Sequence, residues 1–195
     1  MSLKGVYERQ AGWFDAHRDK SLFERGWLER FCAELPEGAR VLDLGCGTGE
    51  PVAAWLIGRG CAVTGMDFAA PMLAMARARF PAARWIEGDM RALDLGEAFD
   101  GVLGWDSFFH LTPEEQREVL PRMARHLAPG GALMLTVGPE AGEAWGEVGG
   151  EPVYHASLSR GEYEAVLGRE GLQMLDFVAA DPGCGGRSVL LAKKG

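Results

Sequence analysis

A glycine-rich turn follows the first run of strand-type residues in the chain. Residues 41–50 read Val-Leu-Asp-Leu-Gly-Cys-Gly-Thr-Gly-Glu, so an apolar run stops in three alternate glycines and a helical pattern begins directly afterwards. Glycine has no Cβ, which lets the main chain adopt angles that other residues avoid and lets a ligand touch it. Strand, glycine turn and helix form the layout that binds small molecules at the carboxyl end of a strand in open α/β sheets. The turn therefore predicts a ligand site.

Two nucleotide-binding motifs do not fit this turn. The dinucleotide fingerprint is G-x-G-x-x-G, and its third glycine is missing whether the motif is read from Gly45 or from Gly47. Glu50 would also place a carboxylate where a pyrophosphate meets a helix N-terminus. A Walker loop needs a lysine, and none occurs between Lys20 and Lys193. The turn excludes a P-loop and disfavours a nicotinamide-dependent oxidoreductase.

Carboxylates end the next two strand-type runs. Asp67 closes the run that begins at Cys61, and Asp89 follows residues 84–87. The separation of Asp43 and Asp67 is about that of a strand-helix-strand unit, which would bring the ends of two neighbouring strands together. There a carboxylate can accept both hydroxyls of a ribose in charge-assisted hydrogen bonds. The alternative is that Asp67 only caps a helix beginning near residue 69.

These segments together resemble the class I S-adenosylmethionine-dependent methyltransferases over about residues 40 to 137. The acid and G-x-G-x-G of their first motif match Asp43, Gly45, Gly47 and Gly49. The later motifs follow in order as Met66-Asp67-Phe68, Glu87-Gly88-Asp89-Met90, Trp105-Asp106 and Pro129-Gly130-Gly131. The resemblance implies S-adenosyl-L-methionine as cofactor. The implied cofactor-binding residues are Tyr7, Asp43, Gly45, Cys46, Gly47, Asp67, Phe68, Met72, Asp89, Met90 and Trp105.

The resemblance also implies a role for most of these residues. Asp67 binds the ribose, and Phe68 and Met72 flank the adenine. Asp89, with the main chain of Met90, meets the amino edge of the adenine. The glycine turn carries the methionine portion of the cofactor.

The second substrate is expected at the same edge of the sheet. Methyl transfer from sulfur is an in-line displacement, so the protein must align the acceptor and, for a hydroxyl or carbon acid, remove its proton. His110 is the first candidate base and Asp106 the second catalytic candidate; alternatively, His110 packs between its neighbours and Asp106 binds backbone amides. Tyr154 and His155 are weaker candidates. The Asn/Asp-Pro-Pro-Tyr motif of nucleobase and glutamine amino methylases is absent, as is a cysteine after the fourth strand, so a small-molecule acceptor is expected.

Composition narrows the class of protein. The 195 residues include 28 acidic and 20 basic side chains, for a net charge of −8, which disfavours nucleic acid as a partner. No apolar run reaches about 18 residues, so no membrane span is expected. The four cysteines lack metal-type spacing, which favours a reduced cytoplasmic protein without bound metal. The oligomeric state stays open, and a non-catalytic S-adenosylmethionine-binding regulator is the alternative function.

Alternating strand and helix patterns predict an α/β fold. We expect one domain over residues 1–195, with an N-terminal helical lid (1–36) on a Rossmann-like core (37–195). The core should hold a seven-stranded, mostly parallel sheet with an antiparallel C-terminal hairpin and helices on both faces. The expected helices are 5–17, 21–35, 50–59, 69–80, 113–127 and 160–169. Capping residues are expected at three of their starts, as Ser21 with Glu24, Thr112 with Glu115, and Ser159 with Glu162. The expected strands are 40–44, 61–66, 84–87, 101–105, 132–137, 172–180 and 187–193, with an irregular connection over 138–151.

Overall fold

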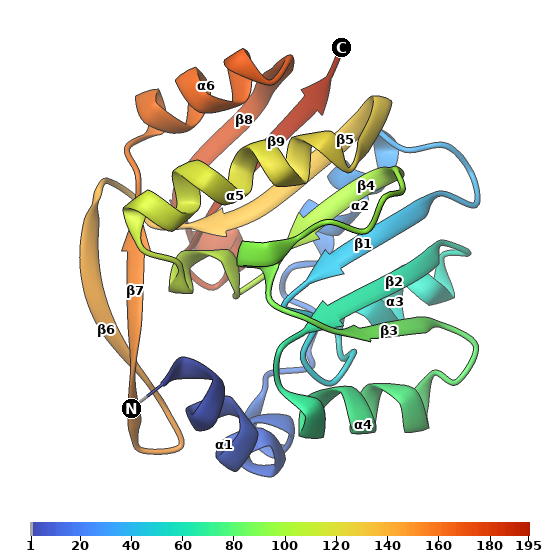
Figure 1. The fold of residues 1–195 in the computed structure, drawn as a ribbon, viewed down its shortest axis with the longest axis vertical. Helices are drawn as coiled ribbons and strands as arrows, with labels where there is room; N and C mark the ends of the chain where they lie inside the picture. Colours follow the sequence, from blue (N-terminus) through green and yellow to red (C-terminus); the bar gives the residue numbers. More distant parts are fainter. Residues whose placement is uncertain (1) are drawn as a thin grey trace.

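A computed structural model describes residues 2–195. Its centre is a seven-stranded sheet in the order β3-β2-β1-β4-β5-β9-β8 (Figure 1). The first five strands run parallel, and β8 and β9 pair antiparallel at one edge. The strands are β1 (Arg40–Leu44), β2 (Ala62–Asp67), β3 (Arg84–Glu87), β4 (Phe99–Gly104), β5 (Leu127–Val137), β8 (Leu172–Asp181) and β9 (Arg187–Lys194). The predicted fold class is confirmed.

Helices cover both faces of this sheet because the central strands are apolar on both sides. Leu42 and Val102 face α5 and α6, whereas Val41 and Leu103 face α2, α3 and α4. All four side chains are fully buried. The helices are α1 (Leu3–His17), α2 (Arg25–Ala33), α3 (Val52–Gly58), α4 (Ala70–Arg79), α5 (Pro113–Arg125) and α6 (Arg160–Arg169). None of them is long and apolar enough to cross a membrane.

Of the three predicted pairs of capping residues, two are confirmed and one is wrong. Thr112 and Glu115 form a full capping box on α5, and Ser159 and Glu162 form another on α6. The box expected at Ser21 does not form, because α2 begins only at Arg25. The Glu24 carboxylate instead accepts a hydrogen bond from Arg18 (2.7 Å).

The irregular connection expected over residues 138–151 is also wrong. Strand β6 (Gly142–Val148) pairs antiparallel with β7 (Glu151–Ser157) as a separate two-stranded ribbon, turning at Gly149 and Gly150. The glycine-rich, glutamate-rich sequence of β6 hid the strand, because β6 is mostly exposed and has no apolar alternation. At Gly146 a Cβ would lie 2.6 Å from the His155 ring, so a side chain cannot fit there.

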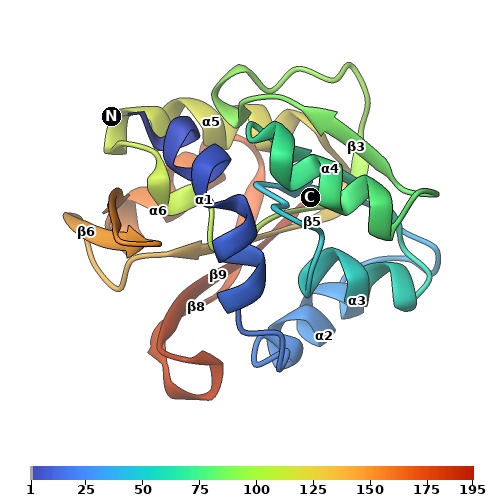
Figure 2. The ribbon, with the colours of Figure 1, turned by 90° about the horizontal axis from the view of Figure 1, so that it is seen from below.

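The first helix joins the two sides of the molecule. Seen from below, α1 lies between the β6–β7 ribbon and α4 (Figure 2). Val6 packs against Val148 and Val153 of the ribbon, while Ala11 packs against Ala69 and Met72 at the start of α4. One short helix thus spans the carboxyl edge of the sheet.

Candidate active site

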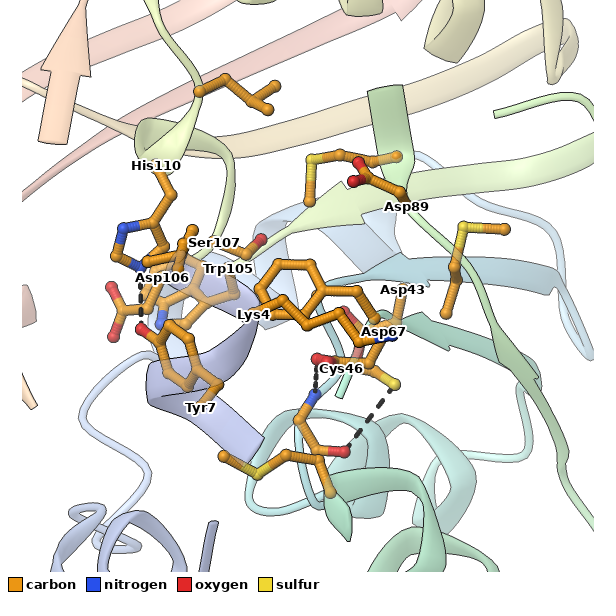
Figure 3. A pocket seen from close by; sticks show the side chains of 18 of the residues that line it. Lys4, Tyr7, Asp43, Cys46, Asp67, Asp89, Trp105, Asp106, Ser107 and His110 are labelled. Atoms are coloured by element: carbon orange, nitrogen blue, oxygen red, sulfur yellow. Dashed lines mark hydrogen bonds between the residues drawn. The ribbon is translucent and has the colours of Figure 1, made fainter. Parts of the chain in front are cut away.

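A cavity of about 400 Å³ lies at this carboxyl edge, beneath α1 (Figure 3). Such a volume suits a cofactor-sized small molecule. It is lined by all the predicted cofactor-binding residues and by both first catalytic candidates, namely Tyr7, Asp43, Gly45, Cys46, Gly47, Asp67, Phe68, Met72, Asp89, Met90, Trp105, Asp106 and His110, but not by the weaker candidates Tyr154 and His155. We call the part around the glycine turn, where the cofactor is expected, the cofactor end, and the part around Asp106 and His110, where the second substrate is expected, the acceptor end. Tyr7, which was expected to bind the cofactor, lies against His110 at the acceptor end.

The glycine turn at the cofactor end is held by its own main chain. The amide of Gly45 donates to the carbonyl of Met66 at the end of β2 (2.7 Å). Gly45 has φ +75°, and a Cβ on it would lie 2.3 Å from that of Ser107. Gly47 has φ +54°, and its amide donates to the Asp67 carboxylate (2.9 Å). Glycine is needed here for both backbone angle and space.

The Asp67 carboxylate is fixed by two main-chain amides, but it does not cap α4, whose N-cap residue is Ala69 and has no side-chain cap. One carboxylate oxygen accepts from the amide of Ala69 (2.8 Å), next to the start of α4, and the other accepts from Gly47. The same carboxylate lines the cavity. Burial raises the pKa of Asp67, although the backbone hydrogen bonds partly offset that effect.

Asp43 lies deeper at the same end. It is 3% exposed, and no group among residues 2–195 donates a hydrogen bond to its carboxylate. Burial, together with the nearby charge of Asp67, raises the pKa of Asp43 to about 7. A buried carboxylate without a protein donor suits a ligand that brings donors or a positive charge.

The rest of the cofactor end is apolar, with one ion pair. Phe68, Met72 and Met90 line the cavity beside Asp89. The Asp89 carboxylate accepts hydrogen bonds from the side chain of Arg91 (2.5–3.0 Å). Burial opposes ionisation of Asp89, but those bonds outweigh it and lower its pKa. The three apolar side chains form a surface on which a ring can pack, and Asp89 places a polar group beside that surface.

Cys46 and Trp105 also lie on the cavity wall. Burial raises the pKa of the Cys46 thiol well above its usual range, so the sulfur is a small neutral group and a poor nucleophile. Trp105 is 5% exposed, and its indole N–H has no partner among the residues that the structure describes. Trp105 thus adds an aromatic surface to the cavity wall.

The acceptor end centres on a chain of hydrogen bonds through His110. Its Nδ1 lies 2.9 Å from the carbonyl of Tyr154 on β7. Its Nε2 lies 2.8 Å from the hydroxyl of Tyr7 on α1 (Figure 3). A carbonyl can only accept, so Nδ1 carries the proton and Nε2 accepts from Tyr7. Burial lowers the pKa of His110 to about 4 and raises that of Tyr7. Both side chains are therefore neutral near pH 7.

Asp106 lies beside this pair but faces two guanidinium groups. Arg187 of β9 lies 3.2 Å from its carboxylate and Arg18 lies 3.8 Å away. The main chain of Asp106 has φ +49°, and its amide donates to the Thr136 hydroxyl (2.7 Å). Ser107 bonds to the Leu44 carbonyl instead. The carboxylate thus sits in a charged cluster and not on the amides near Ser107.

The weaker candidates on β7 also lie near His110. The carbonyl of Tyr154 accepts from His110, while its ring packs against Trp145 (5.6 Å between centroids). The ring of His155 lies 4.9 Å from that of His110.

The structure adds residues that sequence patterns did not suggest. Arg18, in the connection after α1, lines the cavity and pairs with Glu24, which is fully buried. Phe14 and Lys4 of α1 also line it. No motif marks these residues, because their place depends on how α1 packs onto the sheet edge.

Comparisons with known proteins agree with this geometry. A family model described as a methyltransferase domain matches residues 41–131. The malonyl-(acyl-carrier protein) O-methyltransferase of Enterobacter lignolyticus (strain SCF1) is 31% identical over 193 residues, covering 93% of this chain and 74% of that enzyme. The chain belongs to the class I S-adenosylmethionine-dependent methyltransferases.

Two further relatives widen the range of this methyltransferase family. The dTDP-4-amino-2,3,4,6-tetradeoxy-D-glucose N,N-dimethyltransferase of Saccharopolyspora spinosa is 31% identical over 160 residues, or 76% of this chain and 61% of that enzyme. The S-adenosylmethionine-bound structure of an amino pentose methyltransferase from Micromonospora echinaspora superposes with a TM-score of 0.73 at 25% identity, covering 96% of both chains. The cofactor of this methyltransferase is S-adenosylmethionine, and the glycine turn, the buried acids and the apolar wall fit it.

Proposed function

We propose that this methyltransferase transfers the methyl group of S-adenosylmethionine to a small-molecule acceptor that attacks through a lone pair, such as an amine or a carboxylate. The observation that carries the proposal is the hydrogen-bonded pair of Tyr7 and His110 in the same cavity as the glycine turn and Asp67. When bound, S-adenosylmethionine supplies an electrophilic methyl group on its sulfonium.

At the cofactor end, we assign each residue the role that its contacts favour. Asp67 receives the ribose hydroxyls, since its carboxylate lines the cavity and is fixed by two amides. Phe68, Met72 and Met90 hold the adenine, with Asp89 at its polar edge. Asp43 offers a carboxylate to the positive charge of the methionine portion, which favours its ionised form.

At the acceptor end, Tyr7 and His110 orient the nucleophile and take its proton. The Tyr7 oxygen keeps a lone pair free for a donor on the acceptor while its own proton points at His110 Nε2. If the acceptor releases a proton, that proton moves to Tyr7 as the Tyr7 proton moves to His110. The resulting imidazolium keeps its Nδ1–H on the Tyr154 carbonyl.

The low basicity of His110 favours acceptors that need no strong base. A carboxylate is ionised at neutral pH, and a neutral amine attacks through its own lone pair and can leave as the methylated ammonium ion. The two relatives in sequence are an O-methyltransferase and an N,N-dimethyltransferase, so both kinds of atom occur in the family. Asp106 positions Arg18 and Arg187 near the acceptor and takes no proton. The four free thiols suit the cytoplasm as the place of action.

The test is a screen of the purified protein with S-adenosylmethionine and separate sets of amines, carboxylic acids and alcohols. Formation of S-adenosylhomocysteine is the readout. We expect turnover with an amine or a carboxylic acid. Tyr7→Phe and His110→Gln should then lower kcat by roughly a hundredfold, because each variant breaks the pair that orients the nucleophile, while affinity for S-adenosylhomocysteine stays within about twofold.

The matched control is His17→Gln, because His17 lies exposed at the end of α1 and lines no part of the cavity. Its turnover should equal that of the unaltered protein. Cofactor binding without turnover on any acceptor would overturn the proposal and support a binding regulator. Turnover with alcohols alone would overturn the assigned acceptor chemistry.

A further inference from the structure

A polar group buried behind the cavity connects the two segments that meet at His110. Gln116 on α5 is 0% exposed. Its Nε2 donates one hydrogen bond to the carbonyl of Leu111 (3.0 Å) and another to the carbonyl of Ala156 (2.8 Å). Leu111 directly follows His110, and Ala156 lies two residues beyond Tyr154 on β7. One amide group therefore bridges the turn that carries His110 and the strand that carries its hydrogen-bond acceptor.

The amide of Gln116 is itself fixed from its other side. The hydroxyl of Tyr163 on α6 donates to Gln116 Oε1 (2.6 Å). The same hydroxyl accepts from the amide of Leu158 (3.1 Å) and contacts the hydroxyl of Ser157 (3.1 Å). Both N–H groups of the Gln116 amide thus donate, and its oxygen accepts one hydrogen bond. A fully satisfied polar network in a low-dielectric core is rigid, and removing one member leaves others unpaired at high cost.

This bridge matters because β7 lies outside the main sheet. Strand β7 pairs only with β6 among residues 2–195, so no ladder of the seven-stranded sheet fixes its distance from the turn Phe108–His110. Yet the carbonyl of Tyr154 must lie within hydrogen-bond reach of His110 to keep the proton on Nδ1. The hydrogen bond at one ring nitrogen of a histidine determines which tautomer the other presents.

We propose that Gln116 is a positioning residue for methyl transfer: its amide sets the spacing between β7 and the His110 turn, and so keeps His110 Nε2 directed at Tyr7. The inference rests on the proposed role of His110 at the acceptor end. It assigns a task in the reaction to a side chain that does not line the cavity.

The experiment compares Gln116→Leu with Val119→Ala in the full-length protein. Leucine removes both donors at similar size. Val119 is buried on the same helix and takes no part in the bridge, so its truncation controls for lost stability alone. The ¹⁵N signals of the histidine rings are recorded with S-adenosylhomocysteine bound, and those of His110 are assigned by their loss in His110→Gln.

In the unaltered protein and in Val119→Ala we expect one His110 tautomer, protonated at Nδ1. In Gln116→Leu the two ring nitrogens should move toward averaged shifts, because Tyr154 no longer holds the ring. With an acceptor from the screen, kcat should fall roughly tenfold or more while cofactor affinity changes by less than about twofold. Tyr163→Phe keeps both hydrogen bonds from Gln116 Nε2, so it should change the His110 shifts and kcat in the same direction but by less. This variant replaces Gln116→Leu in the test if Gln116→Leu does not fold.

Unchanged His110 shifts in the Gln116 and Tyr163 variants would overturn the inference, as would an equal change in Val119→Ala. The spectrum also separates this inference from the proposed function. A protein that methylates no acceptor, but whose His110 signals shift in Gln116→Leu, would refute the function and still support the bridge.

Discussion

The two ends of the cavity are built by different means. At the cofactor end, main-chain groups donate the hydrogen bonds that hold the site. The amides of Gly45, Gly47 and Ala69 fix the turn and the Asp67 carboxylate. At the acceptor end, side chains from separate elements hold one another, as in the bond between Tyr7 of α1 and His110. Backbone-built sites depend on short stretches of sequence, whereas side-chain-built sites depend on how distant elements pack. A backbone-built cofactor site can therefore stay the same among related enzymes, while a side-chain-built acceptor site changes with the acceptor.

The largest expected effect is loss of cofactor binding in Asp67→Ala. The variant removes the proposed acceptor of two ribose hydroxyls and releases the amide of Gly47. Charged hydrogen bonds contribute about 1.5–3 kcal/mol each, so affinity for S-adenosylhomocysteine should fall by more than about a hundredfold. Titration calorimetry measures it.

The conservative variant Asp67→Asn tests the same carboxylate without emptying the position. Its side-chain oxygen can still accept from one amide, so the turn should persist while the ribose loses a charged partner. Its affinity for S-adenosylhomocysteine should lie between those of the unaltered protein and Asp67→Ala. Affinity within threefold of the unaltered protein in Asp67→Ala would show that the ribose lies elsewhere, and the contrast between the two ends would fail.

Acidity should affect the two ends in opposite directions. His110 has a pKa of about 4 in the folded protein against an ordinary 6.5, so the unfolded chain binds more protons between those values. The free energy of unfolding that depends on His110 therefore falls by up to about 3 kcal/mol as the pH drops from 6.5 to 4. Asp43 has a pKa of about 7 against 3.8, so the folded protein holds the extra proton, and stability is lost as the pH rises through that window.

Urea unfolding between about pH 4 and pH 7 measures both slopes. Relative to His110→Gln, the unaltered protein should gain stability as the pH rises. Relative to Asp43→Asn, it should lose stability. If the unfolding free energy changed with pH in the same direction relative to both variants, either His110 or Asp43 would not be buried as described.

The glycine turn should resist substitution more than an ordinary turn does. Alanine at Gly45 adds a Cβ at positive φ and 2.3 Å from Ser107, so unfolding free energy should fall by about 3 kcal/mol or more. Gly96 also has positive φ (+65°), but a Cβ there has no atom within 4 Å. Gly96→Ala should therefore cost only about 1 kcal/mol. Equal losses in the two variants, measured by urea unfolding, would mean that Ser107 moves aside.

The smallest effect is expected for Asp106→Asn. An amide still fits between Arg187 and Arg18 but loses the charge that attracts them. Because Asp106 is proposed to position and not to accept a proton, kcat should fall by less than about tenfold, far less than in His110→Gln. Steady-state kinetics with the acceptor found in the screen measures kcat for both variants. A loss as large as that of His110→Gln would make Asp106 the base.

Much of the cofactor end could be predicted from the sequence because its determinants are local. The glycine turn needs only the positions of Gly45 and Gly47 after an apolar strand, and the acid at Asp67 follows from the strand order. The capping box of Thr112 and Glu115 was predicted for the same reason, since it lies within one helical turn.

The acceptor end was less predictable because its determinants are distant in sequence. Strand β6 has no apolar alternation because it is mostly exposed, and the β6–β7 ribbon pairs with no strand of the main sheet. Glu24 has the spacing of a capping residue, yet the burial of α2 directs its carboxylate to Arg18. The Tyr7–His110 bond joins residues from opposite sides of the sheet edge, and no pattern along the chain encodes such a pair.

Helix α1 contributes Tyr7 to the acceptor end, and its Phe14 lies against the glycine turn at Gly47. If the predicted lid opens when ligands exchange, Tyr7 moves with α1, and its hydrogen bond to His110 breaks. The proposed proton path would then be complete only while α1 covers the cavity.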